Sequence, residues 1–243
     1  MAGALKRGSL IVFEGCDLSG KTTQVTKLME KLNREGKPAK MLRFTDRTTG
    51  IGSIVNYYLT CANLHCNNIS VGWRCTKALD DHAAHLVFSA NRWELEQDIL
   101  STLNAGTHVI IDRYVYSGVA FSAAKLSLSL SWCKQPDIGL PRPDMVCFLD
   151  VSEEVAIKRA NFAGEEYNLT QFQRKLRENY TRLRDPSWVT VNADRTMEEV
   201  EGELSKIVWE EVGKQDRKEV GKLWVEELDE RDCEMDEKLI KAF

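Results

Sequence analysis

The chain has 243 residues, 43% of them hydrophobic, and a formal net charge of −4, which is the composition of a soluble globular protein. No apolar run is long enough to span a membrane, and the eight residues before the first apolar segment are too few for a signal peptide. We therefore expect a cytoplasmic protein, with the nucleus as the alternative compartment.

The negative charge is concentrated at the C-terminus. Residues 225–243 contain eight acidic and three basic residues, so the remainder is close to neutral. A neutral body argues against broad nucleic-acid binding. We predict one domain over residues 1–224 and an acidic extension over 225–243, either a solvated helix or disordered. The seven cysteines show no paired framework and are expected to be reduced thiols.

The stretch from Gly15 to Thr22 has the pattern of a phosphate-binding loop: glycine, four residues, then Gly-Lys-Thr. Its glycines allow successive backbone N–H groups to point at a phosphate. Lys21 can reach the outer phosphates, and the Thr22 hydroxyl can ligate magnesium. An apolar run over 9–13 precedes the loop and a helical pattern follows it, so a helix N-terminus should face the anion. The sequence therefore predicts a nucleoside-triphosphate site.

Apolar strands alternate with helical patterns along the rest of the chain. After the strand at 9–13, further strands are expected at 39–44, 108–111, 145–149 and 188–191. Helices are expected at 51–59, at 81–105, from 117, at 153–162, at 170–183 and at 197–212. This alternation predicts an α/β fold, a doubly wound, mainly five-stranded parallel sheet with a short helical lid at about 153–168.

Residues 60–79 break this pattern. They contain Cys61, His65, Cys66 and Cys75 but no closely spaced cysteine pair, so a surface loop is favoured over a zinc site.

Charged residues follow two of the predicted strands at the edge where open α/β sheets bind ligands. Asp112 is a candidate partner for magnesium held by Thr22, or alternatively a helix cap. Arg113 beside it and Arg47 after the second strand suggest a second anion, because arginine binds phosphate bidentately.

Phe88 and Arg92 lie four residues apart on one predicted helix face. Together they could stack on and hydrogen-bond a nucleobase, although a core residue beside a surface charge would give the same spacing. With the two arginines, they favour a phosphotransferase that acts on a phosphorylated, nucleotide-like acceptor.

Several segments resemble the thymidylate kinases of eukaryotic type. They are residues 44–49, 81–94, 112–121, 139–144 and 222–224, in the family's order within residues 8–224. The resemblance implies ATP-dependent phosphorylation of thymidine monophosphate (dTMP) to the diphosphate in dTTP biosynthesis. It also implies Mg²⁺ as the cofactor and a homodimer, with small nucleotides as the other partners.

The resemblance also implies a set of site residues. Those implied for ATP are Gly15, Cys16, Leu18, Ser19, Gly20, Lys21, Thr22, Thr23 and Arg159. Those implied for dTMP are Asp17, Phe44, Arg47, Phe88, Arg92, Arg113, Ser117, Gly118, Phe121, Tyr167 and Gln173. The catalytic set would be Asp17, Lys21, Arg47, Asp112, Arg113 and Arg159, with Thr22 and Asp112 holding Mg²⁺ partly through water.

Within this set, Arg47 and Arg113 would bind the acceptor phosphate, and Asp17 the deoxyribose 3′-hydroxyl. Phe88 would stack on thymine while Arg92 donates to its carbonyl. Phe44 would line the acceptor site, Phe121 would disfavour a 2′-hydroxyl, Tyr167 and Gln173 would lie near sugar and base, and Arg159 would pack on adenine.

The chain departs from the family pattern at three points. Leu18 occupies a position that is usually basic in this subtype, and Glu166 stands where close relatives have arginine. Either catalysis is weakened, or Lys158 or Arg159 supplies the charge. Thr45 replaces a usual proline, which could loosen the loop carrying Arg47. Finally, the segment 60–79 is longer than the family norm.

Two other functions stay open. One is a deoxynucleoside kinase or a broader nucleoside monophosphate kinase, although paired Arg47 and Arg113 favour a monophosphate acceptor. The other is a nucleotide-binding protein without turnover, for which Leu18 would be the mark.

Overall fold

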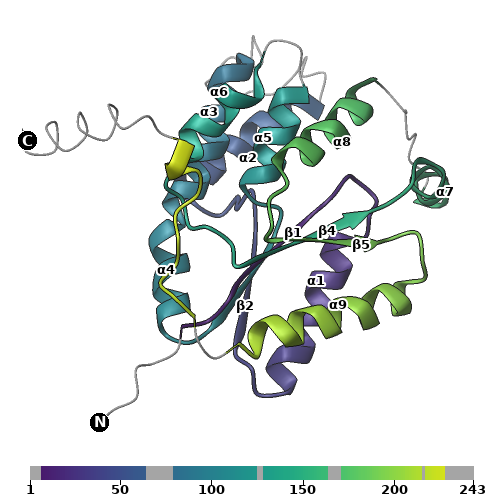
Figure 1. The fold of residues 1–243 in the computed structure, drawn as a ribbon. Helices are drawn as coiled ribbons and strands as arrows, with labels where there is room; N and C mark the ends of the chain where they lie inside the picture. Colours follow the sequence, from purple (N-terminus) through teal and green to yellow (C-terminus); the bar gives the residue numbers. More distant parts are fainter. Residues whose placement is uncertain (1–6, 64–78, 125–127, 164–170, 215–216, 228–243) are drawn as a thin grey trace, which may run out of the picture.

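The computed structural model describes residues 7–63, 79–124, 128–163, 171–214 and 217–227 (Figure 1). Its centre is a five-stranded sheet in the order β2-β3-β1-β4-β5. The strands are β1 (Leu10–Glu14), β2 (Ala39–Arg43), β3 (His108–Asp112), β4 (Met145–Asp150) and β5 (Trp188–Asn192). Every neighbouring pair is parallel, which confirms the doubly wound sheet expected from the sequence.

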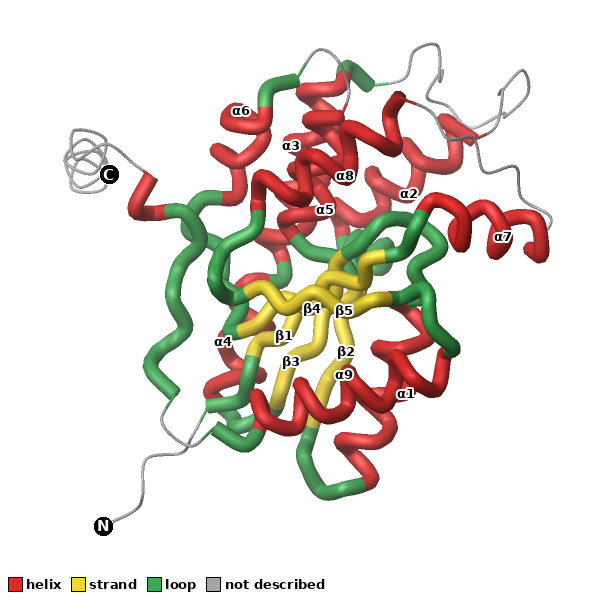
Figure 2. Tube along the Cα trace, turned by 45° about the vertical axis from the view of Figure 1, so that its right-hand side comes forward, coloured by secondary structure: helices red, strands yellow, loops and turns green. Residues whose placement is uncertain are grey.

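Helices connect the strands and cover both faces of the sheet (Figure 2). They are α1 (Lys21–Arg34), α2 (Gly50–Asn63), α3 (Asp81–Glu94), α4 (Glu96–Asn104), α5 (Val115–Ala124), α6 (Leu130–Lys134), α7 (Glu153–Ala163), α8 (Gln171–Leu183) and α9 (Met197–Val212), with short 3₁₀ turns η1 (Gln135–Asp137) and η2 (Val225–Glu227). Helices α1 and α9 lie together on one side of the sheet (Figures 1 and 2).

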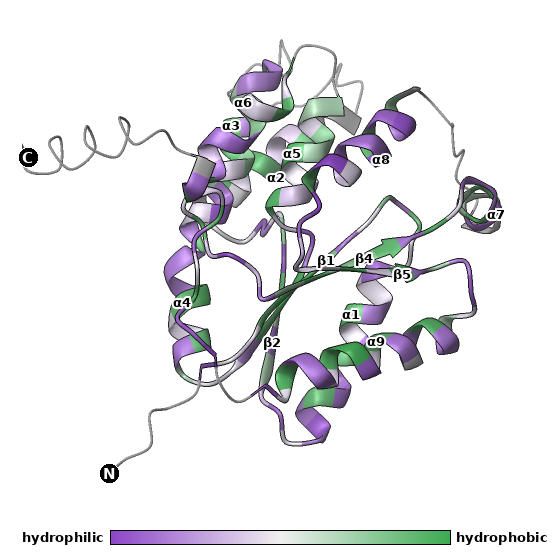
Figure 3. Cartoon of the chain, in the orientation of Figure 1, coloured by the Kyte–Doolittle hydropathy of each residue, from purple (hydrophilic) through white to green (hydrophobic). Residues whose placement is uncertain are grey.

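Alternate residues of the strands face the two helical layers, because successive side chains of a strand point to opposite sides. In β1, Leu10 and Val12 join the core cluster that contains residues of α4, α5 and α8. Ile11 and Phe13 join the cluster built with α1 and α9. All four side chains are fully buried, and the apolar strands are visible between helices of mixed polarity (Figure 3). Burial on both faces explains why the strands read as continuous apolar runs.

The single helix predicted over 81–105 is wrong: two helices, α3 and α4, meet at Leu95. The Leu95 N–H bonds to the carbonyl of Arg92, three residues earlier, which tightens the turn and ends α3. Leu95, Ile99 and Leu103 nevertheless all enter the same core cluster. The apolar spacing therefore continues through the break and could not reveal it.

Two further elements differ from the sequence expectation. Helix α2 continues to Asn63, so it includes the first residues of the segment 60–79, and α6 was not predicted. By contrast, α9 has the predicted bounds and begins with a capping box between Thr196 and Glu199. Within the described ranges, no helix has the length and apolar character needed to cross a bilayer.

Two predictions fall on parts of the chain that the structure does not describe. His65, Cys66 and Cys75, considered above as zinc ligands, lie outside the described residues, as do Glu166 and Tyr167 of the predicted lid. Among the described residues, no group of three or more histidine, cysteine, aspartate or glutamate side chains could hold a metal ion. Cys16, Cys133 and Cys147 are free thiols, as expected.

Candidate active site

The phosphate-binding loop joins β1 to α1 and depends on two glycines. Gly15 has φ 146°, and a Cβ there would lie 2.5 Å from the carbonyl oxygen of Leu149 in β4. Gly20 has φ 85° and directly precedes α1. Both positions therefore need glycine, the first for close approach to β4 and the second for a left-handed turn. The loop ends at the N-terminus of α1, where backbone donors and the helix dipole favour an anion.

Lys21, the first residue of α1, is held under the loop. Its Nζ donates to the carbonyl of Cys16 at 2.6 Å and to Ser19 Oγ at 3.0 Å, and the residue is buried. Burial, followed by the charge of Arg113, lowers the pKa of Lys21 to about 8. A phosphate bound in the loop would place negative charge beside the Lys21 ammonium and favour its charged form, so the site favours an anionic ligand.

Thr22 and Asp112 lie together beside the loop. The Thr22 hydroxyl donates to Asp112 Oδ2 at 2.6 Å, and Arg43 Nε lies 3.7 Å from the same oxygen. The other carboxylate oxygen, Asp112 Oδ1, is buried and has no hydrogen-bond partner within the described part of the chain. A buried carboxylate oxygen without a partner is costly, which suits a residue whose ligand is a cation or a cation-bound water.

Arg113 and Asp17 connect the end of β3 to the phosphate-binding loop. Arg113 has φ 66°, and its Nη2 donates to Asp17 Oδ1 at 2.5 Å. Its guanidinium carbon also lies 5.5 Å from the ring centroid of Phe121 in α5. A non-glycine residue at positive φ is strained, and such strain occurs preferentially at functional sites.

Glu14 was not predicted as a site residue, although hydrogen bonds join its carboxylate to residues that follow Arg113. Its carboxylate accepts hydrogen bonds from the backbone N–H groups of Tyr114 and Ser117 and from Ser117 Oγ. The Tyr180 hydroxyl of α8 lies 2.9 Å from Ser117 Oγ. Burial raises the pKa of Glu14, while its hydrogen bonds lower it. The sequence offered only an acidic residue at the end of an apolar strand.

Arg92, the predicted donor to the base, is buried and paired with an aspartate. Its Nε and Nη2 bond to the two carboxylate oxygens of Asp137 at 3.0 and 2.7 Å, and both residues are at most 2% exposed. Ser89 Oγ adds a third bond to Asp137. The remaining amino group, Nη1, lies against Gly118, where a Cβ would approach it to 2.7 Å. The guanidinium is therefore fixed in one orientation.

The loop that carries Arg47 is joined to α3 by several hydrogen bonds. Asn91 accepts from the Asp46 N–H at 3.0 Å and donates back to the Asp46 carbonyl at 3.0 Å. Glu94 accepts from the Thr49 hydroxyl at 2.7 Å. Arg47 itself is exposed and reaches Asn56 of α2 at 3.3 Å.

The two predicted aromatic residues have different surroundings. Phe44 is buried and packs on Tyr114, with ring centroids 5.5 Å apart, so it is mainly a core residue beneath the site. Phe88 is half-buried and meets Tyr58 edge to face at 6.1 Å. Phe88 therefore keeps part of its surface open on the face of α3 next to Arg92.

Helices α7 and α8 contribute Arg159 and Gln173. Arg159 of α7 donates to the carbonyls of Leu18 and Ala193 at 2.9 and 2.6 Å, so it ties the phosphate-binding loop to the end of β5. Gln173 of α8 has a buried Oε1 without a hydrogen-bond partner in the described residues. Such an oxygen suits a side chain that faces a ligand.

A phosphate-binding loop between the central strand and α1, with arginines and a carboxylate at the same edge of a parallel sheet, defines a P-loop phosphotransferase fold. The comparisons with known proteins are more specific. The family model described as Thymidylate kinase matches residues 13–204. The chain belongs to the thymidylate kinase family.

Curated relatives and a solved structure agree with this assignment. The chain is 45% identical to a thymidylate kinase of Arabidopsis thaliana over 85% of this chain and 73% of the relative. It is 40% identical to the Homo sapiens thymidylate kinase over 91% of this chain and 99% of the relative. The structure of thymidylate kinase from Candida albicans superposes with a TM-score of 0.73 at 34% identity, covering 89% of this chain and 98% of that one.

Proposed function

We propose that this chain transfers the γ-phosphoryl group of ATP to dTMP, giving ADP and thymidine diphosphate. The observation that supports this most directly is the Asp17–Arg113 pair between the phosphate-binding loop and the end of β3. It provides a second cationic group beyond the loop itself. A nucleoside acceptor would not need that group, whereas a monophosphate acceptor would.

The acceptor would be held at both ends. Arg113, with Arg47 on the loop after β2, would bind the phosphate, and Asp17 would hold the sugar. Phe88 would stack on the base, and Arg92 would present Nη1 to a base carbonyl. The Asp137 carboxylate supports this role because it fixes Arg92 in a single orientation. Positioning of this kind supplies a large part of the rate in phosphoryl transfer.

The donor would be held by the loop amides, Lys21 and Arg159. Thr22 and Asp112 fit a magnesium ion, since Mg²⁺ prefers oxygen ligands and Asp112 Oδ1 is buried without a partner among the described residues. When bound there, Mg²⁺ would neutralise charge on the donor phosphates. Lys21 would meanwhile approach the outer phosphates once it leaves Cys16 and Ser19.

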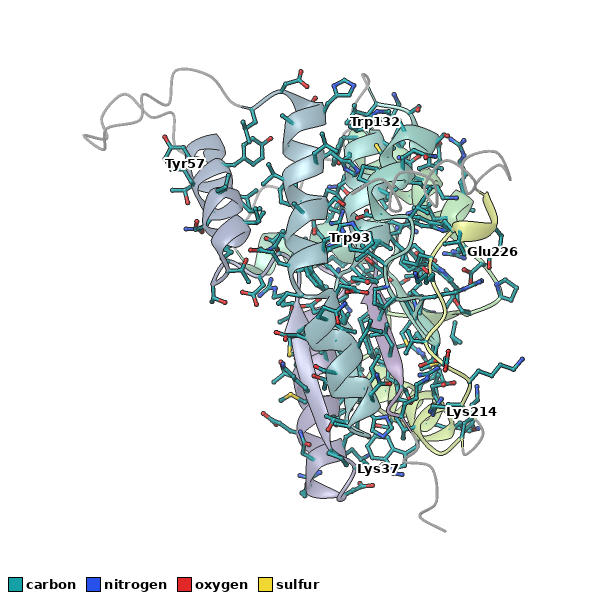
Figure 4. The ribbon with its side chains drawn as sticks, turned by 90° about the vertical axis from the view of Figure 1, so that its left-hand side faces the viewer. Lys37, Tyr57, Trp93, Trp132, Lys214 and Glu226 are labelled. Atoms are coloured by element: carbon teal, nitrogen blue, oxygen red, sulfur yellow. The ribbon has the colours of Figure 1, made fainter. Side chains whose placement is uncertain are left out.

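We also propose a homodimer through α2 and α3. Four large apolar side chains on these helices are 40–48% exposed: Ile54, Tyr57, Leu86 and Trp93. Figure 4 shows Tyr57 beside α2 and Trp93 beside α3. Replacing Leu86 by Asp should convert a dimer to a monomer in sedimentation velocity, while Met197→Asp, at a similarly exposed position on α9, should not. A monomeric wild-type chain would contradict this assembly.

The function is tested by steady-state ADP release with ATP, Mg²⁺ and dTMP, with deoxyuridine monophosphate, deoxyguanosine monophosphate and thymidine as alternative acceptors. We expect turnover with dTMP and little with thymidine. Preferential turnover of thymidine would favour a nucleoside kinase. Binding of both nucleotides without turnover would instead make this a nucleotide-binding protein, with Leu18 as the cause.

A further inference from the structure

The phosphate-binding loop of this chain supplies few cations of its own. Between its glycines, Cys16 and Ser19 are buried, Asp17 is engaged with Arg113, and Leu18 is apolar. Lys21 is the one cationic side chain from Gly15 to Thr22. Phosphoryl transfer needs positive charge around the three equatorial oxygens of the moving group. A further cation from outside the loop is therefore needed.

The sequence suggested Lys158 or Arg159 as the source of this positive charge, but neither fits that role well. Both amino groups of Arg159 bond to carbonyl oxygens, one at Leu18 and one at Ala193. This guanidinium therefore already has a role in holding the loop. Lys158 is exposed on α7. Arg113 is engaged by Asp17 and is proposed to hold the acceptor phosphate.

Arg177 of α8 has a different environment. Its Nη1 donates to Asp150 Oδ1 at 2.7 Å, and its Nη2 bonds to the Val151 carbonyl. Asp150 is the last residue of β4 and Val151 follows it; the carbonyl of Leu149 in the same strand lies against Gly15. Arg177 is thus tethered beside the start of the phosphate-binding loop. Its side chain is 42% exposed, and a guanidinium has five N–H donors, so donors remain for a phosphate.

The electrostatics agree with this location. Burial raises the pKa of the Cys16 thiol, and the charge that most strongly opposes this rise is that of Arg177, ahead of Lys21. Cys16 is within the loop, so the positive charge of Arg177 reaches this part of the loop.

The helix face that carries Arg177 also faces the site. Gln173, Arg177 and Tyr180 are spaced at i, i+4 and i+7, so they share one side of α8. Gln173 has a buried oxygen without a described partner, and Tyr180 reaches Ser117 beside Arg113. Helix α8 packs against α5, and both lie above the sheet in the view of Figure 1. Arg177 lies between Gln173 and Tyr180 on this face of α8.

We propose that Arg177 contacts the phosphoryl group during transfer and supplies the charge that Leu18 does not. The assignment rests on the proposed kinase function. In the structure described here, Asp150 holds the guanidinium near the loop. When ATP and dTMP are bound, the γ-phosphoryl oxygens become its acceptors.

The test compares turnover of four variants with that of the wild-type chain at saturating ATP and dTMP. Arg177→Gln should reduce kcat by about 10³-fold, in the range found for arginines that neutralise this transition state. Arg174→Gln, an exposed arginine on the same helix, should leave kcat unchanged. Asp150→Asn breaks the pair but keeps the guanidinium, so its loss should be much smaller than that of Arg177→Gln.

The fourth variant returns a cation to the loop. Leu18→Arg combined with Arg177→Gln should recover at least about tenfold of the lost turnover, because a guanidinium then approaches the same oxygens from the other side. A merely structural role for Arg177 predicts no such rescue.

The outcomes separate the two proposals. Equal turnover of Arg177→Gln and Arg174→Gln, equal losses for Asp150→Asn and Arg177→Gln, or no rescue by Leu18→Arg would each overturn the assignment of Arg177 while leaving the kinase function intact. A wild-type chain that releases no ADP with dTMP would instead overturn the proposed function, and the assignment with it.

Discussion

Arg92 and Asp137 form a bidentate ion pair in which the arginine is 2% exposed and the aspartate fully buried. The pair links α3 to the short η1 turn, 45 positions later in the chain. It also leaves one amino group of Arg92 directed at Gly118. If Arg92 contacts the base as proposed, this one ion pair affects both stability and base recognition.

Removing the charge of Asp137 should destabilise the fold strongly. Asp137→Asn keeps the size of the side chain but leaves the guanidinium buried without a counter-charge, at a cost of about 3–5 kcal/mol in the free energy of unfolding. Urea unfolding followed by circular dichroism measures this loss. The control is Glu201→Gln, which breaks the partly exposed pair with Lys27 and should move the midpoint far less. Equal midpoints for both variants would contradict the importance of the buried pair.

Gly118→Ala should impair the acceptor site without unfolding the chain. The added Cβ would lie 2.7 Å from Arg92 Nη1, and the guanidinium cannot easily move because Asp137 holds it. We expect a loss in kcat/KM for dTMP of ~10- to 100-fold, mainly through a raised KM.

Gly202→Ala is the matched control for this substitution. Gly202 is also within a helix, but nothing lies within 4 Å of its added Cβ. It should stabilise the chain by about 0.5–1 kcal/mol and leave kinetics unchanged. An unchanged KM for dTMP in Gly118→Ala would argue against contact between Arg92 and the base.

Asp112→Asn should raise the Mg²⁺ concentration needed for half-maximal rate. The substitution removes the carboxylate charge beside Thr22, and changes to such supporting ligands cost about 10- to 100-fold in metal affinity or activity. A titration of initial rate against Mg²⁺ at fixed ATP should show a raised half-saturation. As a control, nucleotide binding in the presence of a chelator should be the same for the variant and the wild type. If the variant's rate curve against Mg²⁺ overlays that of the wild type, the metal assignment is wrong.

ATP affinity should fall as pH rises through about 8. Burial lowers the pKa of Lys21 in the free chain to about 8, whereas bound phosphates favour its charged form and raise that pKa. Above pH 8 binding therefore takes up a proton, and Kd should rise up to about tenfold per pH unit. Calorimetry at pH 7.5, 8.5 and 9.5 measures this change in the Kd for ATP. In Lys21→Arg the group stays charged, so the slope should vanish; a slope that persists would assign it to another group.

The sequence predicted those features that depend on local pattern. All five strands and the helix Met197–Val212 follow from apolar runs and spacing, and the phosphate-binding loop from its glycines. The break at Leu95 was missed because the apolar positions continue through it.

The predicted site lacked those partners that are distant in sequence. Asp137 lies in a proline-rich stretch with no signal that it pairs with Arg92, and Glu14 appeared only as the end of a strand. Arg177 stood among several charges on a polar helix, and only the fold brings it to Asp150. Pairing across the fold is set by packing, which spacing along the chain does not encode.

Helix α3 has one further consequence for selection among acceptors. Asn91 fixes the loop that carries Arg47, and the next residue, Arg92, is the proposed contact for the base. If Arg47 binds the phosphate and Arg92 the base, both ends of the acceptor are positioned by adjacent residues of one helix. Because the spacing between these residues is fixed, an acceptor with one phosphate more or fewer could not meet both contacts at once.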